Sequence, residues 1–164
     1  MEISWLQAVL LGLWACLSSM PGMGGSSIGN YTLGRPLVGG LVCGLILGDV
    51  TTGILVGCAM QVVYIALVTP GGTVSADVRA VSYIGIPLAM VALSSYGLGA
   101  DTAEGSALAT SFGTMVGTLG TVLFYGTATI NLVWQHMGWK AVEYRQYHKL
   151  YLIDMGLPWI SHLS

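Results

Sequence analysis

The feature that most constrains this chain is a ladder of glycines in the apolar segment between residues 35 and 77. Glycines recur at every fourth position, first at Gly40, Gly44 and Gly48 and then at Gly53 and Gly57. Glycines at that interval share one helix face and allow two backbones to pack closely within lipid. The segment is interrupted by one aspartate, Asp49, and ends in an amide, a Pro-Gly-Gly break and a carboxylate. This order predicts a tightly packed membrane core with a polar pocket at a broken helix.

The composition also indicates a membrane protein. Of the 164 residues, 54% are hydrophobic and only 7% are charged, whereas soluble domains carry about 25% charged residues. The formal net charge is -2, and Lys and Arg form no cluster that would bind nucleic acid. We therefore expect an integral membrane protein with no nucleic-acid partner.

The residues that usually carry chemistry are not arranged for it. The histidines have no carboxylate at ligand spacing, and no glycine cluster is followed by the G-K-[ST] of a phosphate-binding loop. No serine or cysteine has a base at a suggestive spacing. The cysteines lack C-x-x-C spacing and are interpreted as packing residues, at Cys16, Cys43 and Cys58. We expect the chain to have no metal, no cofactor and no catalytic residues of its own.

The apolar runs predict three to five membrane elements. Residues 3–20 form the first run, and a glycine-rich break follows it. Residues 36–48 are too few to cross a hydrocarbon core of roughly 30 Å. A single helix over 36–69 would place Asp49 near its middle, where lipid does not tolerate an unpaired charge. Two shorter elements that meet at Asp49 fit better, as a re-entrant hairpin or as strongly tilted helices.

Two further runs follow. Residues 80–98 contain Pro87, where a kink is expected, and the stretch from 105 to 139 has no charged residue. The second stretch is long enough for one full span and an extension, and G-T-M-V-G at 113–117 repeats the close-packing spacing. A polar connection, A-D-T-A-E-G, separates the two runs.

The C-terminal part has a different pattern. Apolar and aromatic residues follow helical spacing while the bases face elsewhere, which predicts a basic amphipathic helix lying in the membrane interface. One face of this helix carries Met137, Ala141, Tyr144, His148 and Tyr151, and the bases off that face are Lys140, Arg145 and Lys149. The excess of bases places this segment on the cytoplasmic side. We divide the chain into a transmembrane core, 1–135, and an interfacial helix with a tail, 136–164. The predicted fold class is an all-α integral membrane protein with glycine-rich tilted, broken or re-entrant helices.

Candidate binding residues lie around the Pro-Gly-Gly break. Gln61 and Asp77 offer an amide and a carboxylate, which suit the many hydroxyls of a sugar. Gly71 and Gly72 free backbone groups for the same task, and Tyr64 offers an aromatic face to a sugar ring. The three side chains also have structural alternatives. Asp77 could be a helix N-cap, Gln61 could make a hydrogen bond between helices, and Tyr64 could simply pack in the core.

Two other charged residues have structural interpretations. Asp49 could cap the following helix, or it could pair with Arg35 or Arg79 at a membrane face. Arg35 precedes Pro36 and is expected to anchor the start of its helix at the interface.

Three ordered motifs resemble a known family. They are M-E-I-x-x-L-Q at the N-terminus, L-G-R-P-L-V-x-G-L-V-x-G-L-I-L-G-D-V-x-T-G-I, and G-x-x-M-Q-V-V-Y-I, and P-G-G-x-x-x-A-D completes the pattern. Together they resemble the membrane subunit IIC of the mannose–fructose–sorbose class of the bacterial sugar phosphotransferase system. The likeness covers nearly the whole chain and thins after about residue 100.

The resemblance implies a function. Family members work with a IID membrane subunit, while soluble IIA and IIB proteins relay phosphate from phosphoenolpyruvate to a sugar bound in the membrane. IIC carries no phosphoryl group itself. The implied sugar contacts are Gln61, the loop at Gly71 and Gly72, and Asp77. The resemblance also implies the bacterial inner membrane, with lipid and the sugar as ligands, and a second copy of the chain is a further candidate partner.

The chain departs from the family pattern at three places. Position 61 is Gln where some relatives have Glu, and Thr-Val-Ser-Ala precedes Asp77 where a proline is often found. Family members also continue through further membrane elements, so we expect this chain to be a shortened or split IIC. A membrane scaffold that does not transport is the alternative function.

Overall fold

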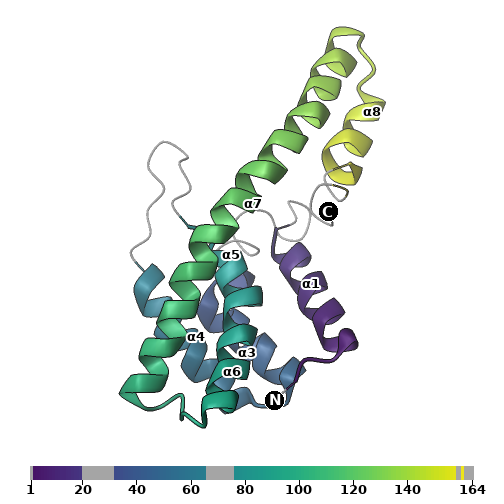
Figure 1. The fold of residues 1–164 in the computed structure, drawn as a ribbon. Coiled ribbons are helices and arrows are strands. Elements are labelled where there is room, and N and C mark those ends of the chain that lie inside the picture. Colours follow the sequence, from purple (N-terminus) through teal and green to yellow (C-terminus); the bar gives the residue numbers. More distant parts are fainter. Residues whose placement is uncertain (1, 20–31, 66–75, 158–159, 161–164) are drawn as a thin grey trace.

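The computed structural model describes residues 2–19, 32–65, 76–157 and 160, and the described elements are helical. Figure 1 shows α1, α3, α4 and α6 gathered beside the first half of α7, whose second half projects beyond them. The helices occur in the order α1 (Trp5–Ser19), α3 (Pro36–Leu47), α4 (Val50–Tyr64), α5 (Val78–Ala80), η3 (Val81–Gly85), α6 (Ile86–Tyr96), α7 (Ala103–Glu143), α8 (His148–Tyr151) and η4 (Leu152–Gly156). The all-helical prediction is therefore confirmed for the described residues.

Helices α3 and α4 form the hairpin that the glycine ladder predicts. Gly48 ends α3 in a left-handed conformation, with φ 84°, and its N–H donates to the Gly44 carbonyl at 2.9 Å. A Cβ atom on Gly53 would lie 2.5 Å from the Gly40 carbonyl oxygen and 2.7 Å from the Gly44 Cα. The two backbones touch directly, so a side chain at these positions has no room.

Asp49 caps the second helix of the hairpin. Its Oδ1 accepts from the Thr52 N–H at 3.0 Å, which confirms the capping alternative. Hydrogen bonds from the Thr52 side chain and backbone hold the pKa of the Asp49 carboxyl below its ordinary value of 3.8. Arg35 lies elsewhere: its Nη1 donates to the Tyr64 carbonyl at 3.3 Å and so satisfies the C-terminal end of α4.

Removing this cap gives the first testable result. Asp49→Ala is expected to destabilise the protein by about 1 kcal/mol, because an N-cap acceptor is lost. The folded pKa is lowered, so the charged cap stabilises the protein above pH 3.8 and this contribution fades as the pH falls through the folded value. Thermal unfolding in detergent should show the deficit at neutral pH and a smaller one in strong acid. Asp49→Asn, which keeps an acceptor, is the control, and equal stability of the alanine and asparagine variants at neutral pH would contradict the assignment.

Residues 78–96 form one continuous helix made of α5, η3 and α6. The turn over Val81–Gly85 is π-helical and lies directly before Pro87. A proline ring clashes with the carbonyl four residues earlier, here that of Tyr83, and a locally wider turn is one way to accommodate it. The expected distortion at Pro87 is therefore found as a π-helical turn. The Tyr83 hydroxyl donates to the Leu33 carbonyl at 2.7 Å and ties this turn to the segment before α3.

Helix α7 runs for 41 residues, about 61 Å at 1.5 Å per residue. Its buried face in the first half is built from small residues, and the spacing in G-T-M-V-G is used as predicted. A Cβ on Gly113 would lie 3.0 Å from Met60, and one on Gly117 would lie 2.6 Å from the Tyr64 hydroxyl. Helix α4 therefore packs closely against α7, and α6 contacts α7 as well.

The predicted single amphipathic helix over 137–151 is wrong. Helix α7 ends at Glu143, and the chain turns back so that α8 and η4 lie against α7 (Figure 1). Arg145 takes a left-handed conformation with φ 55°, while the N–H of Gln146 donates to the Ala141 carbonyl at 2.8 Å. These bonds form a Schellman-type helix end, in which glycine usually occupies the position of Arg145.

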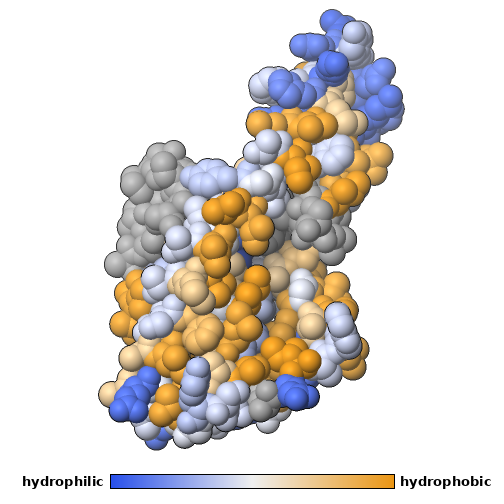
Figure 2. All heavy atoms as spheres, viewed as in Figure 1, coloured by the Kyte–Doolittle hydropathy of each residue, from blue (hydrophilic) through white to orange (hydrophobic). Residues whose placement is uncertain are grey.

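Hydrophobic side chains cover much of the surface. Figure 2 shows them over the middle of the visible face, with hydrophilic residues at the two ends of the molecule. Two helical stretches, Val78–Tyr96 and Ala103–Glu143, are long and apolar enough to cross a membrane.

The charged residues are distributed unevenly between these ends. Figure 1 shows the N-terminal residues and the α3–α4 and α6–α7 connections at the end opposite the tip of α7. Three acids lie in these segments, at Glu2, Asp49 and Asp101, and Glu104 follows in the first turn of α7, whereas the chain places no Lys or Arg there. The bases lie at the other ends of the helices, at Arg35, Arg79, Lys140, Arg145 and Lys149.

Candidate functional site

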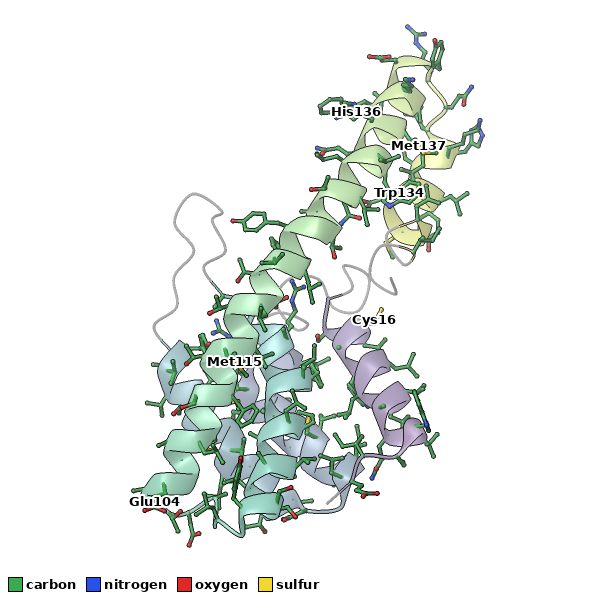
Figure 3. All side chains as sticks on the ribbon, viewed as in Figure 1. Cys16, Glu104, Met115, Trp134, His136 and Met137 are labelled. Atoms are coloured by element: carbon green, nitrogen blue, oxygen red, sulfur yellow. The ribbon has the colours of Figure 1, made fainter. Side chains whose placement is uncertain are left out.

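A cleft lies between α1, the start of the α5–η3–α6 helix and α7, with a volume of about 590 Å³. Pockets that bind small molecules typically measure about 300–1,000 Å³ and are mostly apolar with a few polar groups. Its walls are apolar, with Leu13 on α1, Ile84 on η3 and Phe124 on α7. Cys16, labelled in Figure 3 on α1, lines the same cleft. The charged residues among its described lining are Asp77 and Arg79.

Asp77 is held at the cleft by its backbone and by one carboxylate oxygen. Its N–H donates to the Gly117 carbonyl at 3.0 Å. Its Oδ1 accepts from the N–H groups of Arg79, at 3.0 Å, and Ala80, at 3.4 Å. The N-cap alternative is thus confirmed. Every hydrogen bond that the described residues make to this carboxylate reaches Oδ1, so the cap leaves Oδ2 for another donor.

Arg79 lies beside the same carboxylate. Its Nε donates to Asp77 Oδ1 at 3.4 Å, and the two side chains are 21% and 15% exposed. The guanidinium carbon lies 5.7 Å from the centre of the Phe124 ring, within the range of a cation–π contact. Phe124 and Asp77 together fix the position of the charge.

Close packing brings Asp77 against α7. A Cβ on Gly120 would lie 2.6 Å from the Ala80 Cβ and 3.0 Å from the Asp77 Cβ. Since the Asp77 N–H also bonds to Gly117, the glycine face of α7 sets where the carboxylate sits. The polar part of the cleft therefore depends on residues that carry no functional group.

Tyr64 meets the same face of α7 from another side. Its side chain is buried, with 5% exposed, and its hydroxyl donates to the Gly113 carbonyl at 3.1 Å. The described lining of the cleft does not include it. This geometry favours the packing alternative for Tyr64 over contact with a ligand.

Gln61 lies one turn before Tyr64 on α4 and is also outside the described lining of the cleft. Its Oε1 is buried and has no hydrogen-bond partner among the described residues. A buried amide oxygen without a donor is costly, which marks a place where a further donor is needed. Gly71 and Gly72 lie outside the described residues.

Sequence reasoning missed the contribution of α1 and α7 to the cleft. Phe124, Thr127 and Asn131 lie in a long uncharged stretch and line the cleft from α7. Phe124 carries no sequence signal beyond its hydrophobicity. The sequence suggests Arg79 only as an ion-pair partner for Asp49, whereas the structure pairs it with Asp77.

The comparisons with known proteins were decisive for the family. The family EII-Sor, described as the PTS system sorbose-specific IIC component, matches residues 5–164. The chain belongs to this family. The resemblance carried by the glycine ladder and the G-x-x-M-Q-V-V-Y-I motif is therefore confirmed.

Two curated relatives of this IIC chain have similar identities. It is 31% identical over 156 residues to the PTS system sorbose-specific EIIC component of Klebsiella pneumoniae, covering 95% of this chain and 53% of that protein. It is 31% identical over 143 residues to the mannose-specific EIIC component of Escherichia coli (strain K12), covering 87% of this chain and 48% of that protein. The chain thus spans about half the length of the curated relatives that it matches.

A solved membrane transporter has the same arrangement of helices. The chain matches the cryo-EM structure of the mannose transporter ManYZ in complex with microcin E492 (MceA), with a TM-score of 0.74 and 26% identity. The match covers 99% of this IIC chain and 60% of that chain. The all-helical architecture is therefore one that a membrane transporter uses.

Proposed function

We propose that this chain is the membrane permease subunit of a phosphoenolpyruvate-dependent sugar phosphotransferase system, located in the bacterial inner membrane. It binds a hexose or a related sugar and, with a IID subunit, presents the sugar for phosphorylation by IIB. The observation that carries the proposal is the cleft at Asp77, where a half-bonded carboxylate faces a ligand-sized apolar space.

The chemistry of the cleft suits an uncharged polyhydroxyl ligand. A sugar hydroxyl can donate to Asp77 Oδ2, and charge-assisted hydrogen bonds of this kind are stronger than neutral ones. Thr127 and Asn131 add polar groups on the α7 wall, while Phe124 offers an apolar surface for the carbon skeleton. Gln61, whose amide oxygen has no partner among the described residues, and the loop at Gly71 and Gly72 belong to the proposed sugar contacts as well.

The charge distribution supports an orientation in the membrane. Bases favour the cytoplasmic side, so the acidic end of the molecule faces outward and the tip of α7 inward. Asp77 contacts α7 at Gly117 and Gly120, which lie about 20–24 Å along the helix from Glu104. In a hydrocarbon core of roughly 30 Å, this depth puts the cleft in the cytoplasmic half, within reach of phosphorylation from inside.

The same orientation gives the hairpin and the tip of α7 their roles. Helices α3 and α4 have 12 and 15 residues and measure about 18 and 23 Å, so they form a re-entrant or tilted pair. The part of the chain from 136 to 164, with its bases and aromatic residues, forms the interfacial region beyond the core 1–135. Soluble IIA and IIB approach from this side, and lipid or a second copy of the chain covers the remaining apolar surface.

Asp77→Asn tests the proposed function. Asparagine also serves as an N-cap, so the helix start survives while the charged acceptor is lost. Loss of one charge-assisted hydrogen bond costs about 1.5–3 kcal/mol, which is roughly a 10- to 150-fold loss of affinity. The measurement is phosphoenolpyruvate-dependent phosphorylation of D-mannose, L-sorbose and N-acetyl-D-galactosamine in vesicles that contain IIA, IIB, IID and this chain. For the sugar that the wild type accepts, we expect phosphorylation to fall by about that factor.

The control is Asp101→Asn, which changes an exposed acid in the α6–α7 connection. It is expected to behave as the wild type. Equal activity of the two variants would remove Asp77 from the sugar site.

A membrane scaffold that does not transport is the second candidate. It predicts that none of the three sugars raises the unfolding temperature of the purified chain or supports phosphorylation. Stabilisation by a sugar without phosphorylation would identify a chain that binds but does not translocate.

A further inference from the structure

The polar end of the cleft has no net charge. Asp77 and Arg79 are the charged residues in its described lining, and they lie side by side, with Nε and Oδ1 separated by 3.4 Å. Both side chains are mostly buried, at 15% and 21% exposed. The carboxylate that offers Oδ2 to a ligand is therefore accompanied by a cation at contact distance.

Arg79 is held in this place from two directions. The carboxylate attracts its Nε, and the Phe124 ring lies 5.7 Å from the guanidinium carbon. The Arg79 backbone N–H donates to the same carboxylate oxygen at 3.0 Å, which fixes the start of the side chain. A cation held in this way remains beside Asp77 instead of extending into solvent.

We infer that Arg79 is a specificity-determining residue that makes the cleft accept uncharged sugars and reject amino sugars. The inference rests on the proposed sugar site and deepens it by naming the substrate class. An ammonium group on a sugar would be attracted by Asp77 and repelled by Arg79 over similar distances, so the attraction and the repulsion largely cancel. The ammonium would then lose its hydration without compensation, whereas a hydroxyl or an N-acetyl group loses little.

The inference predicts what happens when the cation is removed. In Arg79→Gln the carboxylate stands alone, and its attraction for an ammonium group is no longer opposed. Two opposite charges about 4 Å apart attract each other appreciably at a surface-like dielectric. Since water screens part of this attraction, we expect a gain of about tenfold or more in the affinity for an amino sugar relative to its N-acetylated form.

The experiment measures that ratio. Binding of glucosamine, galactosamine and mannosamine, each free and N-acetylated, is measured by thermal stabilisation of the purified chain at a pH where the amine is protonated. Arg79→Lys keeps the charge and is expected to keep the ratio near that of the wild type. In the double variant Asp77→Asn with Arg79→Gln, the gain should vanish because no carboxylate remains to attract the amine. The unfolding temperatures without sugar show that each variant is folded.

The outcomes separate the two proposals. Suppose that the wild type binds the N-acetylated sugars but Arg79→Gln leaves the affinity for the amino sugar relative to its N-acetylated form unchanged. The role assigned to Arg79 is then wrong, while the sugar site stands. A gain that persists in the double variant would also overturn it, because the attraction would then come from another group. If the wild type binds none of these sugars, nor D-mannose or L-sorbose, the proposed function itself fails.

Discussion

Gly53→Ala is expected to cause a large loss of stability although it adds only a single methyl group. The added Cβ would lie 2.5 Å from the Gly40 carbonyl oxygen and 2.7 Å from the Gly44 Cα. Both are backbone atoms, so no side-chain rotation can relieve the contact and α3 must move away from α4. Overpacking of this kind typically costs about 1–3 kcal/mol, and we expect the upper end of that range. Thermal unfolding of the purified chain in detergent measures the loss.

The matched control for this variant is Gly12→Ala on α1, where no atom lies within 4 Å of the added Cβ. There the substitution removes a poor helix former and should be neutral or stabilising by up to about 1 kcal/mol. Gly126→Ala on α7 is equally open and should behave in the same way. Similar unfolding temperatures for Gly53→Ala and Gly12→Ala would show that the hairpin is not packed backbone against backbone.

The hairpin is also the part of the fold that the sequence predicts best. A four-residue glycine interval has one simple use in an apolar helix, and Asp49 can lie only where the chain leaves the tightly packed interior. The pattern therefore specified two helices, their contact faces and the turn between them. The glycines of α7 carried the same information, since Gly113 and Gly117 pack against Met60 and Tyr64.

Helix ends could be predicted only where the sequence carries a turn residue. Gly97 marks the end of α6, with φ 66°, by the usual preference of glycine for a left-handed position. The end of α7 uses Arg145 in the same conformation. Arginine carries no such signal, and the apolar spacing continues past it, so periodicity joined two helices that in fact fold against each other.

The candidate site was predictable in its acid but not in its surroundings. Asp77 stands out because a lone carboxylate follows the helix-breaking Pro-Gly-Gly segment in an apolar sequence. The other walls of the cleft come from α1 and α7, and no local pattern indicates that Phe124 and Arg79 would meet. Tyr64 shows the converse case, because the sequence leaves both contact with a ligand and simple packing open for it, and its hydroxyl bonds to the α7 backbone.

Gly120→Ala should separate the position of Asp77 from its chemistry. The new Cβ would lie 2.6 Å from the Ala80 Cβ and 3.0 Å from the Asp77 Cβ, so the start of the α5–η3–α6 helix must move away from α7. This shift would also weaken the bond from the Asp77 N–H to the Gly117 carbonyl, now 3.0 Å long. A binding group that is about 1 Å out of place loses much of its effect, and we expect at least about a tenfold loss in sugar affinity.

A second substitution can relieve the same contact. Because the nearest atom is the Ala80 Cβ, Ala80→Gly combined with Gly120→Ala should recover part of the lost affinity, even though glycine in a helix costs about 1 kcal/mol of stability. Sugar-dependent thermal stabilisation of the single and double variants, with Gly126→Ala as the matched change on the same helix, measures this recovery. A double variant that binds no better than Gly120→Ala would mean that the cleft tolerates displacement of Asp77 or that the loss arises elsewhere. Recovery would show that the distance between two backbones, set by a glycine without a functional group, determines where the carboxylate meets its ligand.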